Sequence, residues 1–125
     1  MLSRTKTKDH RPWGYFVVLS NELEHKVKRI VVYPKKRLSM QRHRYRSEHW
    51  YIIYGEAVVI LNDKKIYLKA GESIDIPQEA VHRIENIGIS NMAFIEIQRG
   101  EYFGEDDIER LEDDYGRELG GKAIS

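Results

Sequence analysis

The stretch QRHRYRSEHW, residues 41–50, fits two different structures. It is either a charged strand at the surface, or a bent segment whose Gln41, His43 and Glu48 turn inward toward a metal ion. Residues two apart share one face of a strand, so Gln41 and His43 project together while Arg42 points away. Glu48 has the opposite parity, and it joins them only if the chain bends after His43.

The residues that follow indicate which side of this segment faces the interior. Glu48, Trp50, Ile52 and Tyr54 alternate along one face, and that face is mostly apolar. Glu48 would then be a carboxylate at the mouth of an apolar interior. A buried carboxylate without a partner is costly, and a bound cation would compensate it.

A second stretch, GESIDIPQEAVHRIEN at residues 71–86, supplies a further candidate ligand. Pro77 ends one expected strand and His82 begins the next, where it shares a face with Ile84 and Asn86. A lone His on an apolar face is more often structural. An amide oxygen, two imidazoles and a carboxylate from neighbouring strands would nevertheless leave coordination positions open for water or substrate.

The surrounding sequence predicts an all-β domain. Short apolar runs separated by turn residues favour a β sandwich or barrel. We expect strands at residues 15–20, 27–34, 37–43, 49–55, 56–62, 64–69, 72–77, 81–87 and 92–98. Near the C-terminus, DDIERLEDDYG at residues 106–116 spaces Ile108, Leu111 and Tyr115 as one helical stripe, with acids in the first turn. This pattern predicts a short C-terminal helix.

Length and composition limit the class of protein. The 125 residues fit a single domain, which we place at residues 11–117, with a mobile extension at 1–10 and a tail at 118–125. The chain lacks an apolar run that could cross a bilayer and an N-terminal signal core. It has no Cys, which excludes disulfides and thiolate ligands and is compatible with a reducing compartment. We therefore expect a cytoplasmic protein without a membrane partner.

Charge is distributed unevenly along the chain. Residues 1–46 carry 13 of the 21 Lys and Arg, whereas residues 101–118 carry nine acids. The basic half could attract an anionic substrate or nucleic acid, or it could pair with the acidic segment within the chain or across a dimer. Nucleic acid is the least favoured partner, because the Arg residues of 41–50 alternate with the inward candidate ligands.

Both stretches resemble the motifs of the cupin family. Gln41-x-His43-x4-Glu48-x6-Gly55 is similar to the first cupin motif, with Gln in place of the leading His. Gly71-x5-Pro77-x4-His82-x3-Asn86 is similar to the second, with Glu79 where a Gly is usual. The resemblance implies a cupin (jelly-roll) barrel, and it implies one divalent metal ion held by Gln41, His43, Glu48 and His82.

Three further segments narrow the resemblance. RPWG (11–14), LSMQRHRYRSEHW (38–50) and GEDDIERLEDDYGR (104–117) look like the C-terminal cupin domain of type II mannose-6-phosphate isomerases. Members often read HHHRAEHW, so Arg44 and Tyr45 replace two His here. That domain often follows a mannose-1-phosphate guanylyltransferase domain in the same chain. The resemblance therefore implies a role in supplying mannose phosphates for GDP-mannose biosynthesis.

The resemblance implies a metal-dependent aldose–ketose isomerase that interconverts mannose 6-phosphate and fructose 6-phosphate. Two alternatives stay open, which are a cupin-type glucose-6-phosphate isomerase and a non-catalytic cupin that binds a sugar or metabolite. The metal could be Zn, Mn, Fe, Co or Ni, since nitrogen and oxygen ligands suit all of them. We also expect a homodimer, which cupins frequently form.

Roles for individual residues follow in part. Arg46, at the expected bend, is the first candidate for contacting the phosphosugar, and Glu48 could act on the substrate as well as bind metal. Arg42 and Arg44 should be solvated, and His49 should point away from Glu48. The general base is unassigned. Tyr45 and Glu96 are candidates, although Glu96 alternates with Ile95 and Ile97 and is expected to face outward.

Overall fold

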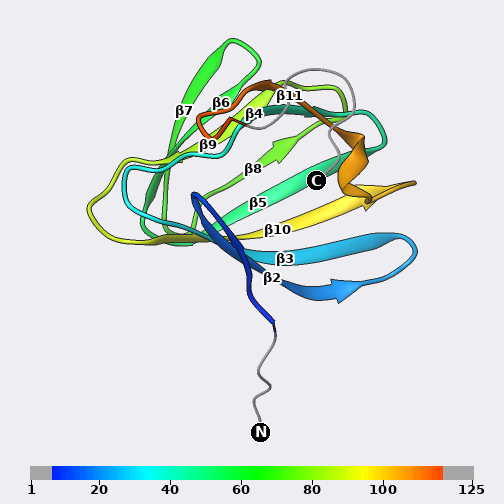
Figure 1. The fold of residues 1–125 in the computed structure, drawn as a ribbon, viewed down its shortest axis with the longest axis horizontal. Helices are drawn as coiled ribbons and strands as arrows, with labels where there is room; N and C mark the ends of the chain where they lie inside the picture. The colour runs from blue at the N-terminus through cyan, green and yellow to red at the C-terminus, as the bar shows by residue number, and fades with distance from the viewer. Residues whose placement is uncertain (1–6, 117–125) are drawn as a thin grey trace, which may run out of the picture.

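The computed structural model describes residues 7–116 and contains two antiparallel sheets that face each other (Figure 1). The strand order is β1-β2-β3-β10-β5-β8 in the six-stranded sheet and β11-β4-β9-β6-β7 in the five-stranded sheet. The strands are β1 Asp9–Arg11, β2 Gly14–Asn21, β3 His25–Val32, β4 Met40–His43, β5 Arg46–Tyr54, β6 Glu56–Leu61, β7 Lys64–Lys69, β8 Ser73–Ile76, β9 His82–Asn86, β10 Met92–Gly100 and β11 Ile108–Glu112. The predicted all-β fold is confirmed, and β2 to β10 correspond to the nine expected strands.

The core lies between the sheets and follows the alternation of the sequence. Ile52, Val59, Ile84 and Phe94 are each 0% exposed. Tyr54 is an exception, because it is 40% exposed although its parity predicts burial. Phe94 pairs with Ile52 while Ala93 pairs with Tyr54, so β5 contains one extra residue at this point. Such a bulge reverses the side-chain alternation beyond it.

The predicted C-terminal helix is wrong. A single 3₁₀ turn at Glu105–Asp107 leads into β11, which pairs with β4 so that Ile108 lies opposite His43. Ile108 and Arg110 are 4% and 5% exposed, a period of two, whereas Leu111 is 37% exposed. The edge of β4 offers unpaired backbone groups, and satisfying them outweighs the local helical pattern.

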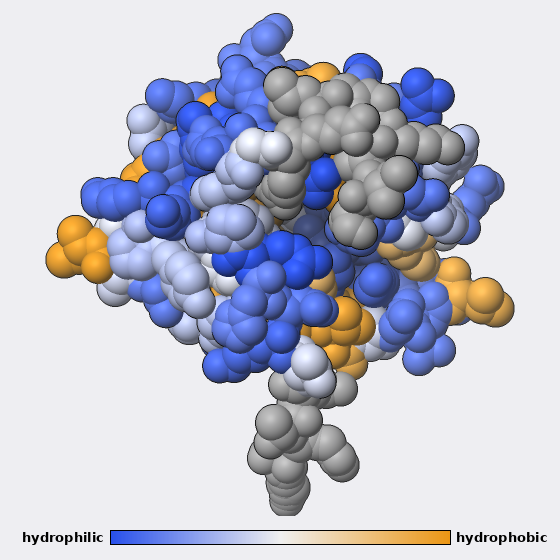
Figure 2. Space-filling view, in the orientation of Figure 1, coloured by the Kyte–Doolittle hydropathy of each residue, from blue (hydrophilic) through white to orange (hydrophobic). Residues whose placement is uncertain are grey.

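The limits of the domain are only partly described. β1 begins at Asp9, within the expected extension, and pairs with β2. Residues 1–6 and 117–125, which include the expected tail, lie outside the described residues. Within 7–116 the structure has no helix long and apolar enough to cross a membrane. The face seen in Figure 2 is mainly hydrophilic, with scattered apolar residues.

Candidate metal centre and substrate cavity

A bend between β4 and β5 brings the two ends of the first motif together, as expected. It consists of Arg44 and Tyr45, whose backbone N–H groups donate to the carboxylate of Asp107 at 3.1 and 3.0 Å. The bend reverses the parity, so that His43 and Glu48, which are 3% and 4% exposed, both face the interior. The 3₁₀ turn before β11 thus fixes the geometry of the motif.

Three of the four predicted ligands form one cluster. The ligand atoms of His43, Glu48 and His82 all lie within 4.8 Å of one another. Gln41 lies directly opposite His82 in the β4–β9 pair and lines the same cavity. Its Nε2 donates to the hydroxyl of Ser39 at 2.8 Å, which leaves the amide oxygen as its ligand atom. Four neighbouring donors of these types fit a divalent ion without thiolates.

The protonation of the cluster also fits a cation. His82 Nδ1 donates to the carbonyl of Ala80 at 2.9 Å, so Nε2 keeps its lone pair. Burial lowers the pKa of His82, and burial lowers that of His43 to about 3. Burial alone would raise the pKa of Glu48, but the neighbouring basic groups His43 and Arg46 outweigh it and lower that pKa. Neutral imidazoles and an ionised carboxylate are the forms that bind metal.

Arg46 belongs to this cluster. It is 4% exposed, its Nε donates to Glu48 at 2.9 Å, and its Nη2 lies 2.9 Å from His43 Nε2. Trp50 Nε1 donates to the other oxygen of Glu48, also at 2.9 Å. The protein therefore supplies a cationic partner for Glu48 itself. These contacts favour a role for Arg46 in positioning the cluster over a role in reaching the far end of a substrate.

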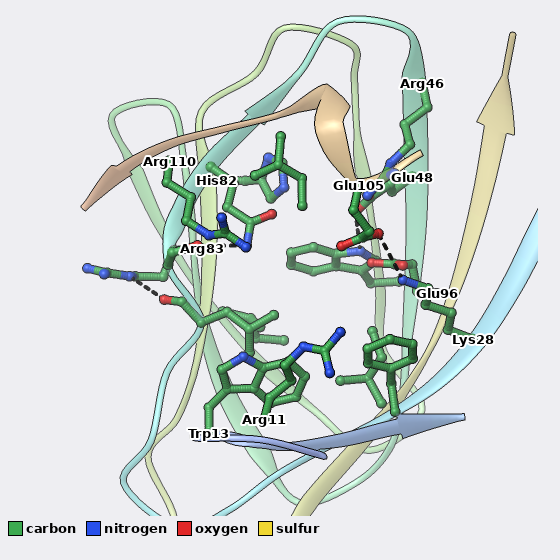
Figure 3. A pocket seen from close by; sticks show the side chains of 18 of the residues that line it. Arg11, Trp13, Lys28, Arg46, Glu48, His82, Arg83, Glu96, Glu105 and Arg110 are labelled. Carbon is green, nitrogen blue, oxygen red and sulfur yellow. Dashed lines mark hydrogen bonds and ion pairs between the residues drawn. The ribbon is translucent and has the colours of Figure 1, made fainter. Parts of the chain in front are cut away.

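Glu48 and His82 of the cluster line a cavity of about 560 Å³ between the two sheets (Figure 3). Glu96 lines this cavity and is 6% exposed, so the expectation that it faces outward is wrong. It shares its parity with Phe94 and Gln98, both of which are 0% exposed. Gln98 Nε2 donates to Glu96 at 2.6 Å. Burial and the charge of Glu48 raise the pKa of Glu96 to about 7.

The cavity also contains charged side chains that the sequence did not indicate as site residues. Lys28 is 5% exposed and lies 3.4 Å from Glu105, while Arg110 reaches in from β11 (Figure 3). Burial alone would raise the pKa of Glu105, but Lys28 outweighs it and lowers that pKa. Lys28 has the parity of Ile30 and Val32, which is the signal that could have placed it inside.

The expected orientations of Arg42, Arg44 and His49 are confirmed. Arg42 is half-exposed and pairs with Glu109, and Arg44 is exposed. His49 is directed away from the cluster and bonds to Asp75 at 2.6 Å. Tyr45, a candidate base, is 49% exposed and is not among the residues that line the cavity.

The basic and acidic halves of the chain pair with each other. Lys28, Arg37 and Arg42 form ion pairs with Glu105, Asp114 and Glu109, respectively. Among the alternatives for the charge asymmetry, pairing within the chain therefore accounts for these three cations.

Glu79 occupies the position at which the second cupin motif usually has a Gly. Its φ is 70°, a conformation that favours glycine, and its N–H donates to the carbonyl of His43 at 2.8 Å. The turn that carries Glu79 thus supports the strand that carries a candidate ligand.

Comparisons with known proteins agree with this geometry. Cupin structures share the fold, including the cupin domain of Cnp3 from Schizosaccharomyces pombe (TM-score 0.69, 14% identity, 72% of this chain and 66% of that one). Oxalate decarboxylase from Lactobacillus farciminis is similar as well (TM-score 0.74, 18% identity, 85% of this chain and 33% of that one). These likenesses establish the cupin fold.

Relatives found by sequence have a higher identity to this chain than these structures do. The chain is 45% identical over 118 residues to the alginate biosynthesis protein AlgA of Pseudomonas aeruginosa, covering 91% of this chain and 24% of that protein. It is 44% identical over 108 residues to mannose-1-phosphate guanylyltransferase 2 of Escherichia coli O157:H7, covering 86% and 22%. The chain thus spans about a quarter of the length of these relatives. The family model described as "Mannose-6-phosphate isomerase C-terminal" matches residues 2–113, and the chain belongs to this family.

Proposed function

We propose that the chain is a metal-dependent isomerase that interconverts mannose 6-phosphate and fructose 6-phosphate. The observation that carries this proposal is the cluster of His43, Glu48 and His82, of which Glu48 and His82 line a cavity between the two sheets. Membership of the mannose-6-phosphate isomerase C-terminal family supports the choice of substrate. The relatives are about four times longer, so their other activities are not assigned to this chain.

In this proposal Gln41, His43, Glu48 and His82 hold one divalent ion. Zn, Mn, Fe, Co and Ni all suit two nitrogen and two oxygen donors. When bound there, such an ion would supply Lewis-acid stabilisation of the negative charge that develops on the sugar oxygens. Trp50 and Arg46 orient Glu48 through their hydrogen bonds, and Ala80 orients His82.

Isomerisation also moves a proton from C2 of the aldose to C1, and the hydroxyl proton of O2 to O1. Of the two catalytic residues expected from the sequence, Glu48 remains one that both binds metal and contacts substrate, whereas Arg46 acts by positioning Glu48. Glu96 is the further cavity carboxylate that we assign to proton transfer. It lies in the wall beside the cluster, and Gln98 fixes the direction of its carboxylate through their 2.6 Å hydrogen bond. A positioned carboxylate of this kind contributes about 10²–10⁴-fold in rate.

The test is a coupled assay for fructose 6-phosphate, run on mannose 6-phosphate with the purified full chain. We expect turnover that a chelator abolishes and an added divalent metal restores. Tight metal binding without turnover on any hexose 6-phosphate would instead support the non-catalytic binding protein. A higher kcat/KM on glucose 6-phosphate than on mannose 6-phosphate would support the glucose-6-phosphate isomerase.

Two expectations stay predictions. The homodimer would appear as twice the chain mass in light scattering after size exclusion. The cytoplasmic location would appear in cell fractionation.

A further inference from the structure

We infer that the cavity contains a separate anion subsite, formed by Arg11 and Lys28 around the ring of Phe16, which takes the phosphate group of the substrate. This inference rests on the proposed function for the identity of the whole ligand. The subsite itself rests on the arrangement of charges described here.

The RPWG segment holds Arg11 in place. Arg11 and Gly14 are paired across a hairpin whose two-residue turn is Pro12 and Trp13. Trp13 is 5% exposed, and its carbonyl accepts a hydrogen bond from Tyr33 N–H at 2.9 Å. A Cβ at position 14 would overlap the carbonyl of Val31, so only glycine lets the hairpin lie this close to β3. The buried Trp thus anchors a turn from which Arg11 extends into the cavity (Figure 3).

Two cations share one aromatic ring at this wall. Lys28 Nζ lies 4.2 Å from the centroid of the Phe16 ring, and Arg11 Cζ lies 5.0 Å from it. The two groups are therefore no more than about 9 Å apart, the sum of these distances. Attraction to the ring holds each cation, but it does not cancel the repulsion between two like charges.

The positive charge is only partly balanced. Glu105 lies 3.4 Å from Lys28, at the long end of hydrogen-bond range, and an ammonium has two further protons to donate. Within residues 7–116 the structure contains no ion pair of Arg11, whose hydrogen bond goes to the backbone carbonyl of His10 at 3.0 Å. A phosphate would accept from the Arg11 fork and from Lys28 together.

The spacing suits a sugar phosphate that also reaches the metal centre. Lys28 lies opposite Glu96 on β10, which in turn lies opposite Trp50 on β5, and Glu48 is the next inward residue of β5. The Cα atoms of Lys28 and Glu48 are therefore about 12 Å apart, from two strand spacings across the sheet and two residues along β5. An open-chain hexose 6-phosphate measures about 7 Å from C2 to phosphorus by ordinary bond lengths. The lengths of the Lys28 and Glu48 side chains account for the difference between this separation and the length of the sugar phosphate.

Two other guanidinium groups that line the cavity, those of Arg46 and Arg83, donate hydrogen bonds to acceptors of the protein itself. Arg46 donates to Glu48 and contacts His43, as described above. Arg83 donates to the carbonyl of Leu38 at 2.8 Å and to Glu112 at 2.9 Å. We assign the phosphate to Arg11, because it lines the cavity and has no ion pair within residues 7–116.

The decisive variant is Arg11→Gln, with Arg44→Gln as its matched control, because Arg44 is exposed and does not line the cavity. Binding of inorganic phosphate to the chelator-treated full chain is measured by titration calorimetry. A charged hydrogen-bonding partner of phosphate accounts for about a ten- to hundredfold change in affinity. We expect that loss for Arg11→Gln and a change below about twofold for Arg44→Gln, where charges are screened by solvent.

A second variant should change the affinity for phosphate in the opposite direction. Glu105→Gln removes the carboxylate that competes with phosphate for Lys28, so it should tighten phosphate binding severalfold. Equal phosphate affinities for Arg11→Gln and Arg44→Gln would overturn the subsite, as would weaker binding by Glu105→Gln. Melting temperatures of the variants identify any that has lost its fold, and the remaining variant then decides.

Turnover separates this inference from the proposed function. If no hexose 6-phosphate is isomerised but Arg11→Gln loses phosphate binding, the subsite stands and the isomerase fails. If mannose 6-phosphate is isomerised and Arg11→Gln has an unchanged KM, the isomerase stands and the subsite fails. If both the subsite and the isomerase activity are correct, Arg11→Gln should raise the KM for mannose 6-phosphate about tenfold or more and change kcat much less.

Discussion

Replacing Glu48 by Gln tests how the candidate metal centre is held together. Glu48 and Arg46 are both 4% exposed and lie 2.9 Å apart, so the variant leaves a buried guanidinium without its counter-charge. Breaking a buried pair on one side costs about 3–5 kcal/mol. At roughly 4 °C per kcal/mol for a domain of this size, the melting temperature should fall by about 12–20 °C.

The assay is urea unfolding followed by circular dichroism in the presence of chelator, so that metal binding does not contribute. Arg42 and Glu109 form a half-exposed pair, and Glu109→Gln is the control, with an expected loss of no more than about 1 kcal/mol. The double variant Glu48→Gln with Arg46→Met removes both buried charges and should recover most of the stability. Neither variant of Glu48 should bind metal. A Glu48→Gln protein as stable as the control variant would refute the reasoning, as would a double variant no better than the single one.

Three further predictions follow from the same geometry. Glu96→Gln should lower kcat for mannose 6-phosphate by about 10²-fold or more while metal content by elemental analysis is unchanged, and an unaltered kcat would remove Glu96 from proton transfer. Glu79→Gly should stabilise the domain by about 1 kcal/mol, because it relieves a positive φ of 70°, and a lower urea midpoint would contradict this. Asn86→Ala should destabilise the domain by about 2–4 kcal/mol, because the buried amide donates to the carbonyls of Val32 and Ser90 and accepts from Gly88 N–H. A loss below about 1 kcal/mol would show that water replaces these hydrogen bonds.

The sequence predicted those features that depend on local alternation. Nine strands followed from apolar runs and turn residues, and the parity of His43 and Glu48 required the bend that the structure contains. The resemblance of the two stretches to the cupin motifs identified His43, Glu48 and His82 as ligands. In the structure their ligand atoms lie within 4.8 Å of one another.

Features that depend on pairing between distant segments were not predictable in this way. The pattern around Ile108 and Leu111 fits a helix when read alone, and only the open edge of β4 turns it into a strand. The alternation of Glu96 with the apolar Ile95 and Ile97 predicts that Glu96 faces outward. The side chains of Ile95 and Ile97 instead lie on the outer face of the six-stranded sheet, where Ile97 is 40% exposed. Apolar residues on an outer sheet face are common enough that alternation alone does not decide which face is inside.

The most direct test of the account is a crystal structure of the purified chain with anomalous scattering measured at the absorption edges of the candidate metals. The account predicts one anomalous peak, about 2.0–2.2 Å from the donor atoms of His43, Glu48 and His82, with the amide oxygen of Gln41 beside it. A metal-containing protein whose peak lies away from these side chains would contradict the account, and so would purified, active enzyme with no peak at any of these edges.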